Sequence, residues 1–178
     1  AIVVAGDKNY LTPMLTTIKS ILYHNQQVKI YILHQNIPSD WFHELKSQVE
    51  RLGSVVEDIY IGNAIDSEWR TQEHISPIAY ARFLIPRLVK EERVVYLDSD
   101  IIINGDLSSL FELDLGDYSI AAVRDADGNG FNSGMLVIDS QKWREKDVTS
   151  MLFDKTVEYM SYLEQTTTEG FNGDQTIF

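Results

Sequence analysis

Residues 93–103 read RVVYLDSDIII, which places two carboxylates inside a nearly unbroken apolar run. Residues two apart in an extended strand share one face, so Asp98 and Asp100 would point the same way, with Ser99 opposite. Two like charges in an apolar setting are costly unless a proton or a cation neutralises them. A turn is the alternative, since Asp and Ser are common turn residues. Strand composition resumes at once in residues 101–103, which favours an acidic, metal-binding pair.

Length and composition indicate one globular domain. The chain has 178 residues, of which 44% are hydrophobic and 11% aromatic, enough for a real core. Its net charge of -12 argues against nucleic acid or an anionic membrane surface as the main partner. The absence of cysteine excludes a disulfide framework and a thiolate zinc site. No apolar stretch reaches the length of a membrane span and no signal peptide opens the chain, so we expect a cytoplasmic protein.

Both ends of the sequence look internal to a longer protein. The first residues form an apolar strand without a methionine, and the last, 176–178, follow what resembles a helix start. We therefore expect residues 1–178 to form a single domain that is truncated at its C-terminus. A tail beyond Phe178 could attach such a protein peripherally to a membrane.

Strands and helices alternate along the sequence. From their apolar and β-branched composition we expect strands at residues 2–5, 28–33, 55–61, 93–103, 119–123 and 135–138. This alternation indicates an α/β fold, with a mostly parallel central sheet and helices on both faces. Ligands of such sheets bind at the carboxyl ends of the strands, near a switch in strand order. Segments 6–10, 98–100 and 124–125 are the informative stretches at strand ends and should meet at that edge.

Capping and first-turn residues mark the expected helix starts: Thr12 with Pro13, Ser39 or Asp40, Ser76 with Pro77, Asp106, Ser140 and Gly173. Pro86 should break the helix that Ser76 opens. Residues 148–163 have the pattern of a longer amphipathic helix, with Met151 and Leu152 among its core positions.

The acidic pair predicts a hard divalent cation. Asp98 and Asp100 offer only oxygen ligands, which favours Mg²⁺ or Mn²⁺ over zinc. Two carboxylates do not fill an octahedral shell, and such sites are usually completed by water and by substrate phosphates. The pair therefore suggests a nucleoside diphosphate or a similar ligand.

The segment after the first strand fits the other end of such a ligand. The carboxylate of Asp7 can accept a hydrogen bond from a pyrimidine imide, and Tyr10 offers a ring for stacking. Ala5 and Gly6 are small enough to let backbone and ligand approach. Taken alone, residues 6–9 are also compatible with an ordinary turn.

Several other chemistries lack their motifs. The sequence contains neither GxGxxG nor GxxxxGK[ST], and it has no GxSxG and no cysteine nucleophile. Residues 132–134 (Asn-Ser-Gly) could by themselves be a loop-to-strand joint, and residues 173–175 (Gly-Asp-Gln) a helix cap. Their occurrence together with the acidic pair is what favours a functional site.

The chain resembles glycosyltransferase family 8, the retaining group that includes bacterial galactosyl- and glucosyltransferases and glycogenin. The matching stretches are in family order and span the whole chain: residues 5–10 (AGDKNY), 79–82 (AYAR), 95–100 (VYLDSD), 131–134 (FNSG) with Trp143 after it, and 173–175 (GDQ).

The resemblance implies a Rossmann-like nucleotide-diphospho-sugar transferase fold of the GT-A type, a UDP-hexose donor and a Mn²⁺ or Mg²⁺ ion. It assigns roles to these residues: Asp7, Asn9 and Tyr10 to the uridine; Ser99 to the nucleotide; Asp98 and Asp100 of the DxD motif to metal, diphosphate and ribose; Arg82, Asp125, Asn132, Ser133 and Asp174 to the donor sugar; and Gln175, with Asp174, to the catalytic centre. Because the side-chain amide of Gln175 is a poor nucleophile, we favour attack by the acceptor on the anomeric carbon from the same face as the departing leaving group.

Two departures from the family pattern concern the metal and the acceptor. Family members carry a later histidine that completes the metal site, and it would lie beyond Phe178. The segment 125–131 is very short where many bacterial relatives have a longer acceptor-side loop, so it resembles the glycogenin pattern or lacks a mobile segment. The acceptor could be a glycan, a lipid or a protein.

Two other function classes remain alternatives to a metal-dependent retaining hexosyltransferase. One is a non-catalytic module that binds a nucleotide sugar. The other is a nucleotidyltransferase, which shares paired aspartates. Such an enzyme would be expected to carry a basic, phosphate-binding loop near the first strand, where Lys8 is the only basic residue.

Overall fold

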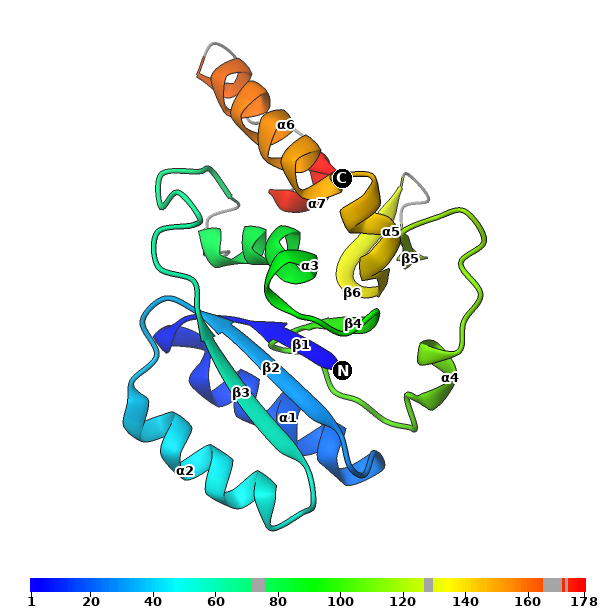
Figure 1. Ribbon diagram of the computed structural model, residues 1–178. Helices are drawn as coiled ribbons and strands as arrows, with labels where there is room; N and C mark the ends of the chain where they lie inside the picture. Colours follow the sequence, from blue (N-terminus) through cyan, green and yellow to red (C-terminus); the bar gives the residue numbers. More distant parts are fainter. Residues whose placement is uncertain (72–75, 127–129, 165–170, 172) are drawn as a thin grey trace.

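The structure, a computed structural model, describes residues 1–71, 76–126, 130–164, 171 and 173–178 (Figure 1). In chain order its elements are β1 (Ile2–Ala5), the 3₁₀ helix η1 (Lys8–Tyr10), α1 (Leu11–His24), β2 (Lys29–His34), α2 (Ser39–Glu50), β3 (Val55–Tyr60), the 3₁₀ helix η2 (Pro77–Leu84), α3 (Ile85–Leu88), β4 (Arg93–Asp98), α4 (Ser108–Phe111), β5 (Ile120–Arg124), β6 (Phe131–Asp139), α5 (Ser140–Glu145), α6 (Val148–Leu163) and α7 (Asp174–Ile177).

One six-stranded sheet, in the order β3-β2-β1-β4-β6-β5, forms the centre of the fold. The strands β1 to β4 run parallel, and β6 is antiparallel to both β4 and β5. This arrangement confirms the predicted α/β fold with a mostly parallel sheet.

The strand order reverses beside β1. The chain moves outward from β1 through β2 to β3, and then returns to place β4 on the other side of β1. The crevice between the carboxyl ends of β1 and β4 is therefore the switch point at which open α/β sheets bind ligands.

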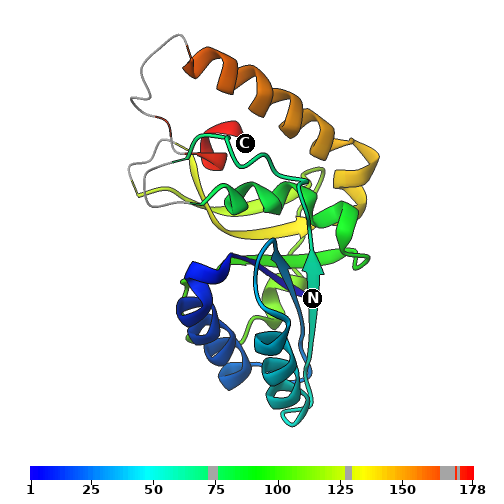
Figure 2. The ribbon, with the colours of Figure 1, turned by 90° about the vertical axis from the view of Figure 1, so that its left-hand side faces the viewer.

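Each face of the sheet carries its own core, and Figure 2 shows α1 and α2 on one side and α6 on the other. Ile2 and Val4 of β1 pack toward α1 and α2, whereas Val3 between them packs with η2, α5 and α6. All three side chains are fully buried. A strand that is buried on both faces is continuously apolar, which is why β1 lacks polar alternation.

The described starts of α1 and α5 differ from the predicted caps. Asp7 caps η1 by accepting a hydrogen bond from the N–H of Asn9, and α1 then begins at Leu11 rather than after Thr12. Asp139, not Ser140, caps α5 through the N–H of Lys142. The Asp139 carboxylate thus satisfies one free N–H group at the start of α5, whereas no side chain caps the start of α1.

Pro86 begins a helix instead of breaking one. The segment that Ser76 caps is a 3₁₀ helix, η2, and the α-helix α3 follows it directly with Pro86 in its first turn. Proline is tolerated there because the first-turn N–H groups have no intrahelical partner.

Two further predictions need correction. The strand β4 ends at Asp98, and Ser99 and Asp100 form the turn that the strand composition of residues 101–103 argued against. In α6, Leu152 is buried as predicted, but Met151 is 57% exposed.

Among the residues that the structure describes, no helix has the length and apolar character needed to cross a membrane.

Candidate active site

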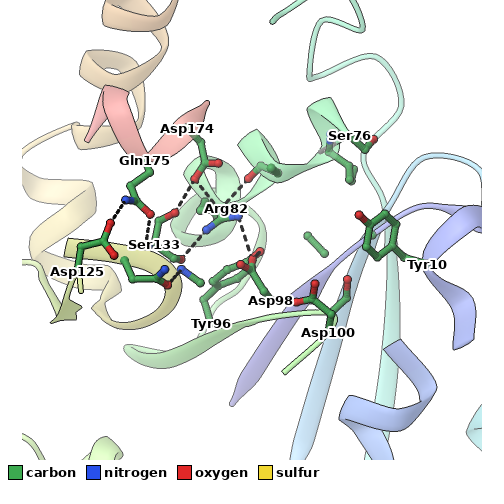
Figure 3. A pocket seen from close by; sticks show the side chains of 17 residues that line it. Tyr10, Ser76, Arg82, Tyr96, Asp98, Asp100, Asp125, Ser133, Asp174 and Gln175 are labelled. Atoms are coloured by element: carbon green, nitrogen blue, oxygen red, sulfur yellow. Dashed lines mark hydrogen bonds and ion pairs between the residues drawn. The ribbon is translucent and has the colours of Figure 1, made fainter. Parts of the chain in front are cut away.

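A cavity of about 380 Å³ lies at the switch point (Figure 3). Its lining comes from the end of β1, η1, η2, the end of β4 with the turn after it, the residue after β5, the start of β6 and the start of α7. Segments that are far apart in the sequence therefore meet where the topology predicts a ligand site.

Arg82 of η2 lies at the centre of the site, with only 4% of its side chain exposed. Its Nη2 donates to Oδ1 of Asp98 at 3.0 Å, and its Nε lies 3.1 Å from Oδ2 of Asp174. The same Nε donates to the carbonyl of Ala79 at 2.9 Å, and Nη1 donates to the carbonyl of Ser133. A buried charge is tolerated only with this degree of pairing.

The protonation states follow from this pairing. Burial acts to lower the pKa of Arg82, but Tyr96, Asp174 and Asp98 raise it, and the net shift is upward. Burial raises the pKa of Asp174, while the Arg82 charge opposes that rise. Burial also raises the pKa of Tyr96 well above its ordinary value, so its phenol keeps its proton.

Ser133 connects the strand β6 to α7. Its hydroxyl donates to Oδ2 of Asp174 at 3.1 Å, and its N–H donates to Oε1 of Gln175 at 3.2 Å. The Nε2 of Gln175 in turn donates to Oδ2 of Asp125 at 2.8 Å. Both ends of the Gln175 amide are thus engaged by other groups.

A break in the β5–β6 ladder shapes this part of the site. Ala122 pairs with Leu136, but the next residue, Val123, pairs with Asn132. Irregularities of this kind redirect side chains and are common beside functional sites. Here the irregular part of β6 supplies Ser133 and Gly134 to the cavity.

Negative charge dominates the cavity. Among its described lining residues, the carboxylates of Asp98, Asp100, Asp125 and Asp174 face one guanidinium, that of Arg82. An anionic ligand would be repelled by this excess unless a cation accompanied it.

The carboxylates of the DxD pair, Asp98 and Asp100, provide part of the oxygen ligands that a hard divalent cation needs. Asp98 and Asp100 both line the cavity, and 36% of the Asp98 side chain is exposed. In the parts of the chain that the structure describes, no group of three or more His, Cys, Asp or Glu residues is placed to hold a metal ion. The two carboxylates could supply two ligands, and the remainder of the shell would come from elsewhere.

Comparison with known proteins identifies the chain. The family profile described as Glycosyl transferase family 8 matches residues 1–178. The chain belongs to glycosyltransferase family 8.

Two relatives of this family 8 chain are pneumococcal. Glycosyltransferase GlyD of Streptococcus pneumoniae serotype 4 is 46% identical over 178 residues, which cover 99% of this chain and 22% of GlyD. Glycosyltransferase GlyE of the same organism is 39% identical over 181 residues, covering 99% of this chain and 43% of GlyE. The chain thus spans less than half the length of either relative.

Solved structures confirm the GT-A type of fold. The crystal structure of GlyE matches 99% of this chain and 41% of its own, with a TM-score of 0.78 and 36% identity. The galactosyltransferase LgtC, solved with donor and acceptor sugar analogs, matches 99% of this chain and 68% of its own, with a TM-score of 0.83 and 23% identity.

The cavity brings together most residues that the sequence pointed to: Tyr10, Arg82, Asp98, Ser99, Asp100, Asp125, Asn132, Ser133, Asp174 and Gln175. Asp98 and Asp100 meet there, although the geometry behind that expectation was wrong. Ser99 lines the same cavity instead of lying opposite.

Two predicted nucleotide residues lie outside the described lining. Asp7 is buried and its Oδ1 accepts the N–H of Asn9 at 2.8 Å, and Asn9 is exposed. Their roles remain predictions. The proposed short loop at 125–131 includes residues 127–129, which lie outside the described part of the chain.

The cavity is also lined by three residues that the sequence did not indicate, Ser76, Ile78 and Tyr96. A signal for Tyr96 was present, because a residue two positions before Asp98 on a strand shares its face. Ser76 stood out only as the start of a helix, and Ile78 did not stand out at all.

We predict that Arg82→Met lowers the free energy of unfolding by about 3–5 kcal/mol at pH 7, because it leaves Asp98 and Asp174 without their buried partner. Without the guanidinium, the folded-state pKa of Asp174 rises further, so the folded state binds more protons than the unfolded state below neutrality. The deficit relative to the parent should therefore shrink from pH 7 to pH 5. Urea denaturation at both pH values measures it.

Arg87→Met is the matched control. Arg87 pairs with Asp147, but its side chain is 49% exposed, so its loss should cost less than about 1 kcal/mol. An Arg82→Met variant as stable as this control would contradict the assigned role of Arg82.

Proposed function

We propose that this chain is the donor-binding and catalytic part of a retaining hexosyltransferase. It transfers a hexose, glucose or galactose, from a UDP-sugar to a glycan, lipid or protein acceptor, with Mn²⁺ or Mg²⁺. Family membership supports glycosyl transfer as the reaction class, and the groups that line the cavity support a UDP-sugar as the donor.

The observation that carries the proposal is the order of chemical groups along the cavity. In Figure 3, Tyr10 lies at one end, the Asp125–Gln175 pair at the other, and Asp98 and Asp100 between them. A UDP-hexose has the same order, with an aromatic base, a diphosphate and a polyhydroxyl sugar. Stacking, cation-mediated and hydrogen-bonding groups would each meet the matching part of this ligand.

The excess of carboxylates in the cavity supports the use of a metal ion. Asp98 and Asp100 would hold the ion, which when bound acts as a Lewis acid on the leaving diphosphate. Arg82, the cationic residue of the described lining, is already paired with Asp98 and Asp174. Neutralising a diphosphate therefore needs a further cation.

The hydrogen bonds of Gln175 support same-face attack by the acceptor. Its amide oxygen accepts the N–H of Ser133 and its nitrogen donates to Asp125, so the amide is oriented as a binding group. In the proposed step the acceptor oxygen bonds to the anomeric carbon as the bond to the diphosphate breaks. A diphosphate oxygen takes the acceptor proton.

Donor turnover tests the proposal. The protein is incubated with Mn²⁺, UDP-glucose or UDP-galactose, and acceptors of the three classes; UDP release is followed and the product anomer is assigned by proton NMR. We expect a product with the anomeric configuration of the donor. An inverted product would contradict the mechanism, binding without turnover would favour the non-catalytic module, and preference for a nucleoside triphosphate would favour a nucleotidyltransferase.

Asp100→Asn should abolish the metal-dependent part of UDP binding and leave the fold intact, because it removes one of two anionic ligands at an exposed position. Calorimetric titration of UDP with Mn²⁺ or with EDTA measures this, and thermal unfolding reports the fold. The exposed Asp154 of α6 provides the control Asp154→Asn, which should bind like the parent. Unchanged affinity of Asp100→Asn in Mn²⁺ would refute the assignment.

Tyr10→Ala should weaken UDP binding by about 1–3 kcal/mol, the scale of stacking between a base and an aromatic ring. Tyr10→Phe keeps the ring and should lose far less. Tyr23 of the same helical region is 84% exposed, so Tyr23→Ala is the control. Equal UDP affinity in Tyr10→Ala and the parent would place the base elsewhere.

A further inference from the structure

The two oxygens of the Asp98 carboxylate have different surroundings. Oδ1 accepts two hydrogen bonds, from the phenol of Tyr96 at 2.7 Å and from Nη2 of Arg82 at 3.0 Å. Within the described residues Oδ2 accepts none, and it lies beside the backbone of Gly134. One oxygen is therefore committed to the protein, and the other is left for a ligand.

Tyr96 is itself held firmly. It is 1% exposed and belongs to the core between the sheet and η2, and the Arg82 guanidinium lies 4.6 Å from the centre of its ring. Its hydroxyl reaches Asp98 because residues two apart on β4 share a face. The two donors to Oδ1 thus come from different elements, β4 and η2, which restricts rotation of the carboxylate more than either donor alone.

Gly134 leaves room for the free oxygen. A Cβ atom at this position would lie 2.7 Å from Oδ2 of Asp98 and 2.8 Å from Oδ1 of Asn132. Any side chain at 134 would push the carboxylate from its place. The orientation of Asp98 is thus fixed on one side by donors and permitted on the other by a missing side chain.

We propose that Tyr96 is a positioning residue: its phenol orients the Asp98 carboxylate so that Oδ2 is presented to the divalent cation that accompanies the donor. The inference rests on the proposed function. It adds to that function a group that is not itself a ligand of the metal and acts on the metal through Asp98.

Partners of metal ligands typically contribute 10–100-fold to metal affinity or activity, because they fix the orientation of the ligand. A phenol that served only the core would behave differently. Its loss would change stability and would affect UDP binding equally with and without metal.

Tyr96→Phe removes the hydroxyl and keeps the ring. We expect the affinity for UDP in Mn²⁺, measured by calorimetry, to fall about 10–100-fold. The affinity in EDTA should stay at the parental value. Manganese electron paramagnetic resonance, with UDP present, should show weaker binding of the ion by the same factor.

Tyr31→Phe is the matched control. Tyr31 is also buried on this face of the sheet, and its phenol also donates to a carboxylate, that of Glu91, at 2.8 Å. Glu91 does not line the cavity. Tyr31→Phe should bind UDP like the parent in both conditions.

The inference is overturned if Tyr96→Phe binds UDP in Mn²⁺ as tightly as the parent, or loses the same factor in EDTA. If the parent itself shows no metal-dependent binding of UDP, the proposed function and this inference fail together. If the parent binds UDP in a metal-dependent way and Tyr96→Phe has the same affinity, only this inference is refuted and the proposed function stands.

A double-mutant cycle separates action through Asp98 from a general effect on the cavity. In an Asp98→Asn background, Tyr96→Phe should change the affinity for UDP in Mn²⁺ by no more than about twofold, because the group through which the phenol acts is gone. A full 10–100-fold loss in that background would show that the phenol acts by another route and would contradict the proposal.

Discussion

The ion pairs of Arg82 with Asp98 and Asp174 hold three separate parts of the chain at one cavity. Arg82 comes from η2, Asp98 from the end of β4 and Asp174 from the start of α7. Burying a guanidinium costs several kcal/mol, which only dense pairing can offset. The Arg82 guanidinium that holds the Asp98 carboxylate therefore also fixes the position of α7, and with it Gln175.

This arrangement also sets the character of the site. Since Arg82 is shared between two carboxylates and two backbone carbonyls, little of its charge is left for a ligand. Asp100 and Asp125 add further negative charge to the cavity. We infer that a site of this composition would bind an anionic ligand only together with a cation.

The fold was largely predictable from the sequence because its elements follow local rules. The continuously apolar β1 and the alternation of strands and helices predicted a mostly parallel sheet, and the carboxyl ends of its strands predicted the place of the site. The meeting of Asp98 and Asp100 was also expected, but for a wrong reason. The strand ends at Asp98, and a turn brings Asp100 to the cavity.

What the sequence could not show are contacts between elements. The resemblance pointed to Arg82 as a donor-sugar residue, but nothing local reveals that it pairs with Asp98 and Asp174 or donates to the carbonyl of Ser133. The role of Gly134 likewise depends on how closely β6 approaches β4. Such properties arise from packing, and a one-dimensional pattern does not contain them.

The most direct test of the account is anomalous diffraction from crystals of the protein grown with UDP and Mn²⁺. The account predicts an anomalous peak for manganese next to the carboxylates of Asp98 and Asp100, in contact with the diphosphate. UDP bound in the cavity with no manganese peak at this pair, or with the peak at another position, would contradict it.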